Sequence, residues 1–117
     1  MLKVYLYKNC STCRDAKKWL QGKGIAFQEL PIRETPPSPA ELKAMVAAQG
    51  GKLSAVFNTS SGDYRELGLK DRLPTMTDEE AFALQQTNGN LVKRPFVIGK
   101  GIGLVGFKPA EWEKAFT

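Results

Sequence analysis

Two cysteines separated by two residues are the part of this sequence best suited to chemistry. Cys10 and Cys13 are the only cysteines in the 117-residue chain, and they lie where a strand-like apolar run ends and a helix-like pattern begins. A Cys-x-x-Cys at such a boundary is typical of redox motifs. A helix N-terminus concentrates unpaired backbone N–H groups and partial positive charge, which favour a thiolate over a thiol. Because the thiolate is the nucleophile, the spacing predicts a redox-active pair.

The positions of the two cysteines predict different roles. Cys10 lies at the expected strand–helix junction, closer to the free amides and more exposed, so we assign it as the nucleophile. Cys13 should lie one turn inside the helix on the same face, within reach of a disulfide, as the resolving thiol. Lys8, Arg14 and Lys17 lie within about a turn and favour the thiolate as well.

A zinc site and a pair of inert, buried cysteines are the alternative interpretations. Structural zinc takes four ligands, usually Cys or His, whereas this chain has two Cys and no His. We therefore predict no metal site. The absence of histidine also excludes a Ser-His-Asp triad and a Cys-His dyad. Inert burial is disfavoured by the positive charge around the pair.

Length and composition predict one compact domain over residues 1–117, with 42% hydrophobic residues. No apolar run approaches the roughly 18 residues that cross a membrane, and the N-terminal residues lack a signal-peptide profile. We therefore expect a soluble cytoplasmic protein whose cysteines are reduced at rest. The net charge of +5 is scattered along the chain. This pattern suits small anions or acidic partner surfaces and does not predict direct nucleic-acid binding.

The order of hydrophobic periodicities predicts an α/β (α+β) fold. A strand over residues 2–7, a helix from a Ser11 or Thr12 cap to residue 22, and a strand over residues 25–30 form a βαβ unit with a parallel pair. Four prolines in residues 31–39 indicate a turn. Helices are expected over residues 39–48 and 77–86. Between them, residues 53–57 form a short helix or an apolar connector, residues 62–67 show helical spacing, and residues 69–73 are a short apolar stretch. Strands at 96–98 and 104–107 and a helix from residue 109 follow.

Four segments of the chain resemble the glutaredoxin-coupled arsenate reductases (ArsC) and their relatives Spx and YffB. The matching segments are residues 6–14 (LYKNCSTCR), 34–38 (ETPPS), 94–95 (RP) and 104–109 (LVGFKP). They span nearly the whole chain in the order of that family. The resemblance implies a thioredoxin/glutaredoxin-like core (β-α-β, then β-β-α) formed by residues 1–32 and 91–117, with an all-helical insertion at about residues 33–90.

The resemblance also implies which residues surround the cysteines. Pro95 matches the cis-proline that faces the active-site cysteine, and Arg94 matches the arginine before it, which helps to bind the oxyanion. Arg14 matches the arginine that follows the catalytic cysteine. Guanidinium groups suit oxyanions because their planar fork makes two parallel hydrogen bonds. An exposed surface role is the alternative for each arginine, and the remaining candidates for substrate contact are Asn9, Ser11, Thr12 and Lys108.

The sequence departs from this family pattern at two places. Arsenate reductases and Spx carry a further arginine in the insertion, where this chain has Asn58, Ser60 or Ser61. The arsenate reductases have serine at the position of Cys13 and use glutathione and glutaredoxin to resolve the oxidised cysteine. Spx has cysteine there and uses the pair as a redox switch while it binds RNA polymerase. Two thiols in this chain would allow an intramolecular disulfide without glutathione.

These observations favour an enzyme, a thiol-dependent oxidoreductase that resembles the arsenate reductases and reduces a small oxyanion such as arsenate or a disulfide. It would hold no cofactor and would draw electrons from glutathione and glutaredoxin or from thioredoxin. The alternative is an Spx-like redox-switched transcriptional regulator that binds RNA polymerase, although the missing insertion arginine counts against it. An inactive scaffold of the same fold is a third hypothesis. The family resemblance implies a monomer.

Overall fold

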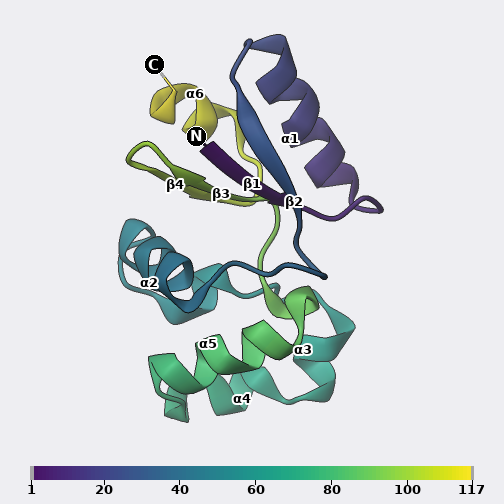
Figure 1. Cartoon of the computed structure of the whole chain (residues 1–117). Helices are drawn as coiled ribbons and strands as arrows, with labels where there is room; N and C mark the ends of the chain where they lie inside the picture. Colours follow the sequence, from purple (N-terminus) through teal and green to yellow (C-terminus); the bar gives the residue numbers. More distant parts are fainter. Residues whose placement is uncertain (1, 117) are drawn as a thin grey trace.

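The computed structural model describes residues 2–116 and shows a four-stranded mixed sheet with helices on both faces (Figure 1). The strand order is β2-β1-β3-β4, in which β1 pairs parallel with β2 and antiparallel with β3, and β3 pairs antiparallel with β4. This arrangement confirms the predicted fold class. Met1 and Thr117, at the ends of the predicted core, lie outside the described residues. The strands are β1 (Leu2–Leu6), β2 (Phe27–Pro31), β3 (Phe96–Gly99) and β4 (Ile102–Val105).

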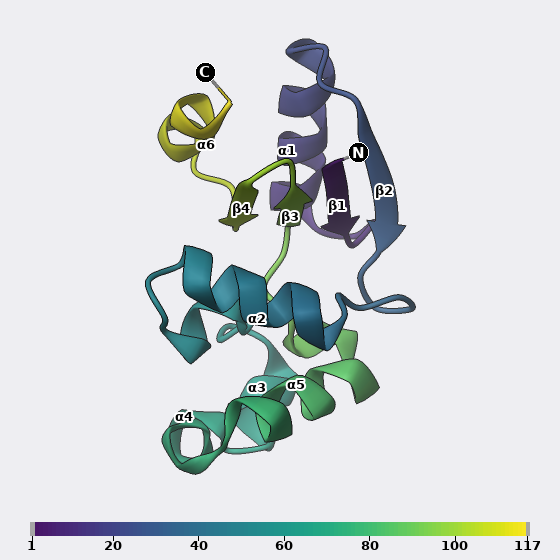
Figure 2. The same cartoon turned by 60° about the vertical axis from the view of Figure 1, so that its left-hand side comes forward.

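Helices α1 and α6 cover one face of the sheet, and α2 covers the other, with α3, α4 and α5 in a further layer beyond α2 (Figures 1 and 2). The chain between β2 and β3 supplies α2 to α5, as the predicted insertion requires. An isolated β-bridge between Phe57 and Val92 joins the segment before α3 to the segment before β3. The helices are α1 (Ser11–Gly22), α2 (Pro39–Ala48), α3 (Gly62–Glu66), α4 (Leu69–Arg72), α5 (Asp78–Thr87) and α6 (Pro109–Ala115), with 3-10 turns η1 (Leu53–Val56), η2 (Leu73–Thr75) and η3 (Gly89–Leu91).

β1 is one of the two interior strands of the sheet, and both of its faces are apolar. Successive side chains of a strand point to opposite faces. Val4 therefore packs in a core with Leu20 of α1 and Trp112 of α6, while Tyr5 packs in a second core with Leu42 of α2. Burying one such side chain stabilises the fold by about 1.5–3 kcal/mol. The core that contains Val4 fixes α1, and with it both cysteines, against the sheet.

The strands differ from the predicted ones by one or two residues at several ends, and the starts of β2 and β4 differ for local reasons. β2 begins at Phe27 because Ile25 still lies in the turn that follows α1, where its backbone N–H donates to the Leu20 carbonyl at 3.1 Å. β4 begins at Ile102 because the preceding turn is short: Lys100 and Gly101 both have positive φ, 53° and 76°.

No helix among residues 2–116 combines the length and the apolarity that crossing a membrane would require.

Glu41, in the first turn of α2, joins that helix to the sheet. Its carboxylate accepts hydrogen bonds from the Tyr5 hydroxyl at 2.7 Å and from Lys3 Nζ at 3.1 Å. It also accepts from the Ser38 backbone N–H at 3.0 Å in a capping box. Burial alone would raise the pKa of Glu41, but these donors together hold its pKa below the ordinary value. Glu41 is therefore a charged anchor between α2 and β1.

We expect Glu41→Gln to lose less stability on acidification than the wild type. A group whose folded-state pKa is lowered contributes stability above its unfolded-state pKa, and that stability is lost as the pH falls through the folded-state value. Between about pH 6 and about pH 3, the wild type should lose roughly 1 kcal/mol more unfolding free energy than Glu41→Gln. Urea denaturation at each pH measures this difference. The exposed Glu66→Gln variant is the control, and identical pH curves for Glu41→Gln and the wild type would contradict the expectation.

Candidate active site

Cys10 and Cys13 lie together at the N-terminus of α1, both as free thiols. Cys10 is half-buried, whereas Cys13 is 1% exposed, which confirms that Cys10 is the more accessible of the two. The expectation that Ser11 or Thr12 caps the helix is wrong. Cys10 is the N-cap residue: its backbone is extended, and its Sγ accepts a hydrogen bond from the Cys13 backbone N–H at 3.2 Å. The sulfur thus accepts a hydrogen bond from a first-turn backbone N–H, a role that the side-chain oxygen of an N-cap residue usually fills.

The environment of Cys13 keeps its thiol protonated. Burial raises the pKa of the Cys13 thiol to about 12, and the hydrogen bond with the Cys10 side chain acts in the same direction. The Tyr7 backbone and the positive charge of Arg94 oppose this effect without overcoming it. Cys13 is therefore a neutral thiol at neutral pH. It lies behind Cys10, as a resolving thiol must.

We expect iodoacetamide to modify Cys10 at least about tenfold faster than Cys13 near neutral pH, because alkylation needs an accessible thiolate. Tandem mass spectrometry of the tryptic peptide that holds both cysteines measures the two sites separately. Cys13→Ser should react like the wild type, and Cys10→Ser should stay unmodified until urea unfolds it. Equal modification of the two cysteines in the folded protein would contradict the assignment.

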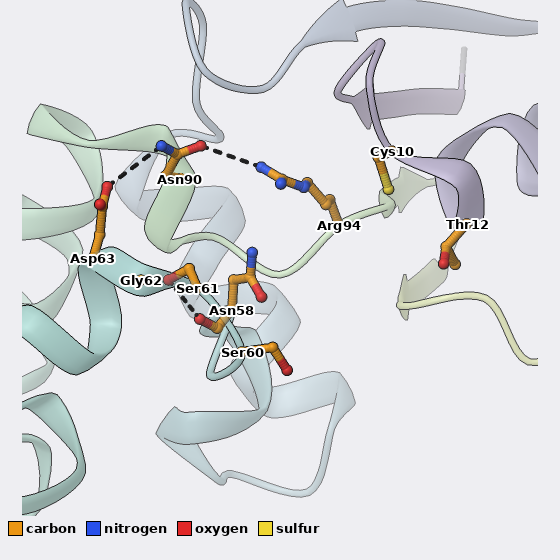
Figure 3. A pocket seen from close by; sticks show the side chains of 9 residues that line it. All are labelled: Cys10, Thr12, Asn58, Ser60, Ser61, Gly62, Asp63, Asn90 and Arg94. Carbon is orange, nitrogen blue, oxygen red and sulfur yellow. Dashed lines mark hydrogen bonds between the residues drawn. The ribbon is translucent and has the colours of Figure 1, made fainter.

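A cavity of about 440 Å³ opens beside Cys10 (Figure 3). The N-terminus of α1, the loop that leads into α3, and the segment before β3 form its walls, so the fold brings together three segments that are far apart in the sequence. The lining is almost entirely polar, with one arginine and one carboxylate. The lining residues are Cys10, Thr12, Asn58, Ser60, Ser61, Gly62, Asp63, Asn90 and Arg94.

Arg94 reaches this cavity from the segment before β3. The Arg94–Pro95 peptide bond is cis, as the family resemblance implies, and Pro95 is buried. The Arg94 guanidinium carbon lies 4.6 Å from the centre of the Tyr7 ring, which indicates a cation–π contact. The guanidinium also donates a hydrogen bond to Asn90 Oδ1 at 3.3 Å. Arg94 is thus held from two sides.

Tyr7, which contacts Arg94, is surrounded by polar donors. Its hydroxyl accepts hydrogen bonds from Asn9 at 3.3 Å and from Arg33 at 2.9 Å. The Arg33 guanidinium carbon lies 5.0 Å from the centre of the Tyr7 ring. The Asn9 hydrogen bond first, and then the Arg33 hydrogen bond, lower the pKa of Tyr7. Asn9, a predicted substrate contact, therefore donates its hydrogen bond to Tyr7 in this structure and is not among the residues that line the cavity.

The other predicted contacts divide into those at the cavity and those outside it. Thr12 lines it, whereas the exposed Ser11 and Arg14 do not. Arg14 donates instead to the Lys8 carbonyl at 3.2 Å. Lys108, the N-cap residue of α6, lines a neighbouring cavity of about 460 Å³, which shares Thr12 and Arg94 with the first one.

The residues at the place of the missing family arginine also lie at the cavity. Asn58, Ser60 and Ser61 all line it. Ser61 has a local structural role, since its Oγ accepts from the Tyr64 backbone N–H at 3.1 Å and donates to the Asn58 carbonyl at 2.9 Å. At the place where the family pattern has a cation, the insertion therefore carries uncharged polar side chains.

Sequence reasoning missed Asp63 and Asn90, which also line the cavity. Asp63 Oδ2 accepts hydrogen bonds from Asn88 Nδ2 at 2.8 Å and from Asn90 Nδ2 at 3.3 Å. These two hydrogen bonds, that from Asn88 first, lower the pKa of Asp63. Residues 88–90 showed only a turn signal. Their position depends on Gly89, where any Cβ would collide with the Ile32 carbonyl oxygen.

Within residues 2–116, no group of three or more Cys, Asp or Glu side chains is arranged to bind a metal ion.

The fold and the cysteine pair define a thioredoxin-like protein with a dithiol at a helix N-terminus. Residues 5–115 match the ArsC family, and the chain belongs to that family. Similar proteins include the uncharacterized protein YusI of Bacillus subtilis, 43% identical over 113 residues that cover 97% of this chain and 96% of YusI. The global transcriptional regulator Spx of Enterococcus faecalis is 32% identical over 112 residues (95% of this chain, 83% of Spx). An arsenate reductase of Rhizobium meliloti is 34% identical over 97 residues (81% and 68%).

Solved structures agree with this assignment. An ArsC family related protein from Bacteroides fragilis superposes with a TM-score of 0.88 at 47% identity, covering 97% of this chain and 96% of that one. The arsenate reductase-like, thioredoxin-fold class expected from the sequence is therefore confirmed. Because the family includes both an arsenate reductase and a transcriptional regulator, membership alone does not define the activity.

Proposed function

We propose that this chain is a thiol-dependent oxidoreductase in which Cys10 is the nucleophile and Cys13 is the resolving thiol. One observation carries the proposal: the accessible Cys10 borders a polar cavity, while the buried, protonated Cys13 lies directly behind it. Such an arrangement separates attack on the substrate from resolution. The proposed site acts in a cytoplasmic monomer that needs no bound cofactor or metal.

For a disulfide substrate, the proposed reaction proceeds in two exchange steps. The Cys10 thiolate attacks one sulfur and forms a mixed disulfide, and the other sulfur leaves as a thiolate. Cys13 then loses its proton and attacks Cys10 Sγ, which forms the Cys10–Cys13 disulfide and releases the second substrate thiolate. The substrate gains two electrons and the protein loses two. Glutathione with glutaredoxin, or thioredoxin, is the proposed donor that returns them.

Arsenate is a second substrate class, supported by the 34% identity to an arsenate reductase. Here the Cys10–Cys13 pair would supply two electrons to reduce As(V) to As(III), and one arsenate oxygen would leave as water. Arg94 is the proposed charged partner of the oxyanion inside the cavity, and Thr12 is the proposed uncharged partner. We propose Arg14 and Lys108, together with Asn9 and Ser11, as outer contacts for an incoming anion or thiol. Pro95 is buried and its carbonyl accepts from the Gly106 N–H at 2.9 Å, so its proposed role is to shape the segment that carries Arg94.

A redox-switched regulator that binds RNA polymerase is the alternative function. Its support is the 32% identity to Spx over 95% of this chain, together with the dithiol. In that case the Cys10–Cys13 disulfide would change the affinity for the polymerase and would catalyse no turnover. Neither function requires direct contact with nucleic acid.

A coupled assay of NADPH oxidation tests the proposal. It is run with glutathione, glutaredoxin and glutathione reductase, and separately with thioredoxin and thioredoxin reductase, on a disulfide substrate and on arsenate. Turnover that Cys10→Ser abolishes supports the oxidoreductase. If no substrate turns over while a Cys10–Cys13 disulfide still forms, the enzyme proposal fails. Co-sedimentation of the oxidised and reduced protein with RNA polymerase then tests the regulator.

A further inference from the structure

The cavity beside Cys10 has opposite charges at its insertion side and at its β3 side. Apart from Cys10, its ionisable lining residues are Arg94 and Asp63. Asn90 connects them, because its Nδ2 donates to Asp63 at 3.3 Å and its Oδ1 accepts from Arg94 at 3.3 Å. Figure 3 shows this chain of two hydrogen bonds, in which the Arg94 side chain extends toward Asn90 rather than toward the Cys10 sulfur.

The carboxylate of Asp63 determines which way the Asn90 amide points in this pair of hydrogen bonds. Its Oδ2 accepts from Asn88 as well as from Asn90, so the NH₂ group of Asn90 must face Asp63. The Asn90 carbonyl oxygen is then the group left to face Arg94. These donors lower the pKa of Asp63, so it is ionised at neutral pH. The negative charge of Asp63 both orients the Asn90 amide and offsets the positive charge of Arg94.

We propose that Asp63 and Asn90 determine the charge specificity of the site. They hold the Arg94 guanidinium turned toward the insertion, away from the Cys10 sulfur, and keep the cavity near neutrality. Cys10 therefore reacts with uncharged disulfides in preference to substrates carrying two negative charges, such as arsenate. This inference rests on the proposed role of Cys10 as nucleophile. A dianion near Arg94 is repelled by Asp63, and the uncharged Asn58 and Ser60 offer no compensating cation within the lining. Arg33, whose charge also acts on Asp63, is not among the lining residues.

Asp63→Asn tests the proposal because it removes the charge and keeps an oxygen that can accept from Asn88 and Asn90. The reduced protein is mixed with dithiodipyridine, which is uncharged at neutral pH, or with dithiobis(nitrobenzoate), which carries two carboxylates. Both release a coloured thiol. The ratio of the two initial rates, compared between the variant and the wild type, reports the change in charge selectivity, because intrinsic differences between the two reagents cancel. Asp71→Asn, which removes one exposed carboxylate from α4, is the matched control.

We expect Asp63→Asn to raise the rate with the dianionic disulfide, relative to the neutral one, by about fivefold. Asp71→Asn should change this ratio by less than about twofold. An unchanged ratio in Asp63→Asn would overturn the proposal. Asn90→Leu should raise the ratio as well, because it releases Arg94 from the chain of hydrogen bonds.

A binding experiment separates this inference from the proposed function. Titration of inorganic phosphate into isotope-labelled protein, followed by NMR, measures anion affinity without any reaction at Cys10. If neither disulfide reacts at Cys10, the proposed function fails. Tighter phosphate binding to Asp63→Asn than to the wild type and Asp71→Asn then supports the charge assignment, and equal binding overturns it.

Discussion

Replacing Cys10 by serine is expected to abolish turnover in the coupled assay, with a loss on the order of a thousandfold or more. The serine hydroxyl is not ionised at neutral pH, and Cys13 cannot substitute for Cys10. Its side chain is 1% exposed, and burial raises the pKa of its thiol to about 12. Initial rates of NADPH oxidation measure the loss, and circular dichroism checks that the variant is folded. Substantial activity in Cys10→Ser would contradict the assigned nucleophile.

Cys13→Ser is the matched variant and should behave differently. The first exchange step needs only Cys10, so this variant should accumulate a mixed disulfide that intact-protein mass spectrometry detects. In the presence of excess glutathione, an external thiol can attack that mixed disulfide, and part of the turnover should return. With thioredoxin as the only donor, a larger deficit is expected. If Cys13→Ser matched the wild type with every donor, Cys13 would have no resolving role.

Trp112→Ala is expected to cost about 3–5 kcal/mol of unfolding free energy. Trp112 is 1% exposed, and its ring centre lies 4.8 Å from that of Phe107 and 5.6 Å from that of Trp19. Its Nε1 also donates to the Gly106 carbonyl at 3.2 Å. The substitution removes both the packing and the donor, between α6, α1 and the sheet. Because small domains have only about 5–15 kcal/mol of stability, this loss is a large fraction of the total.

Urea denaturation of the wild type, Trp112→Ala and Trp112→Phe measures this effect. Phenylalanine keeps an aromatic ring in the cluster and loses the N–H donor, so we expect it to cost about 1–2 kcal/mol. The difference between the two variants measures the packing contribution of the aromatic ring that phenylalanine retains. If Trp112→Ala and Trp112→Phe were equally stable, the aromatic cluster would not hold α6 to the core.

Local sequence signals were sufficient to predict most of the elements. Ser38, Pro39 and Glu41 marked the start of α2, and the structure places it there, with the capping box formed. Thr77 marked the start of α5 in the same way. These signals work because the interacting groups lie within one helical turn of each other, so no tertiary information is needed.

The candidate site was only partly predictable because it depends on contacts between distant residues. Cys10, Thr12 and Arg94 were named from the motif and the family resemblance, and they do line one cavity. Asp63 and Asn90 are 27 positions apart, and nothing in the local sequence indicates that they meet. The conformation of Arg14 was equally hidden, because its bond to the Lys8 carbonyl depends on the path of the turn before α1.

The mass of the intact protein after reaction with one equivalent of dithiodipyridine tests the central claim most directly. The account predicts that the wild type loses two hydrogens and releases two equivalents of thiol, because Cys13 resolves the adduct on Cys10. Cys13→Ser should stop at the adduct with one equivalent released, and Cys10→Ser should stay unreacted. A stable adduct on the wild type, or reaction of Cys10→Ser at the wild-type rate, would contradict the assignment of nucleophile and resolving thiol.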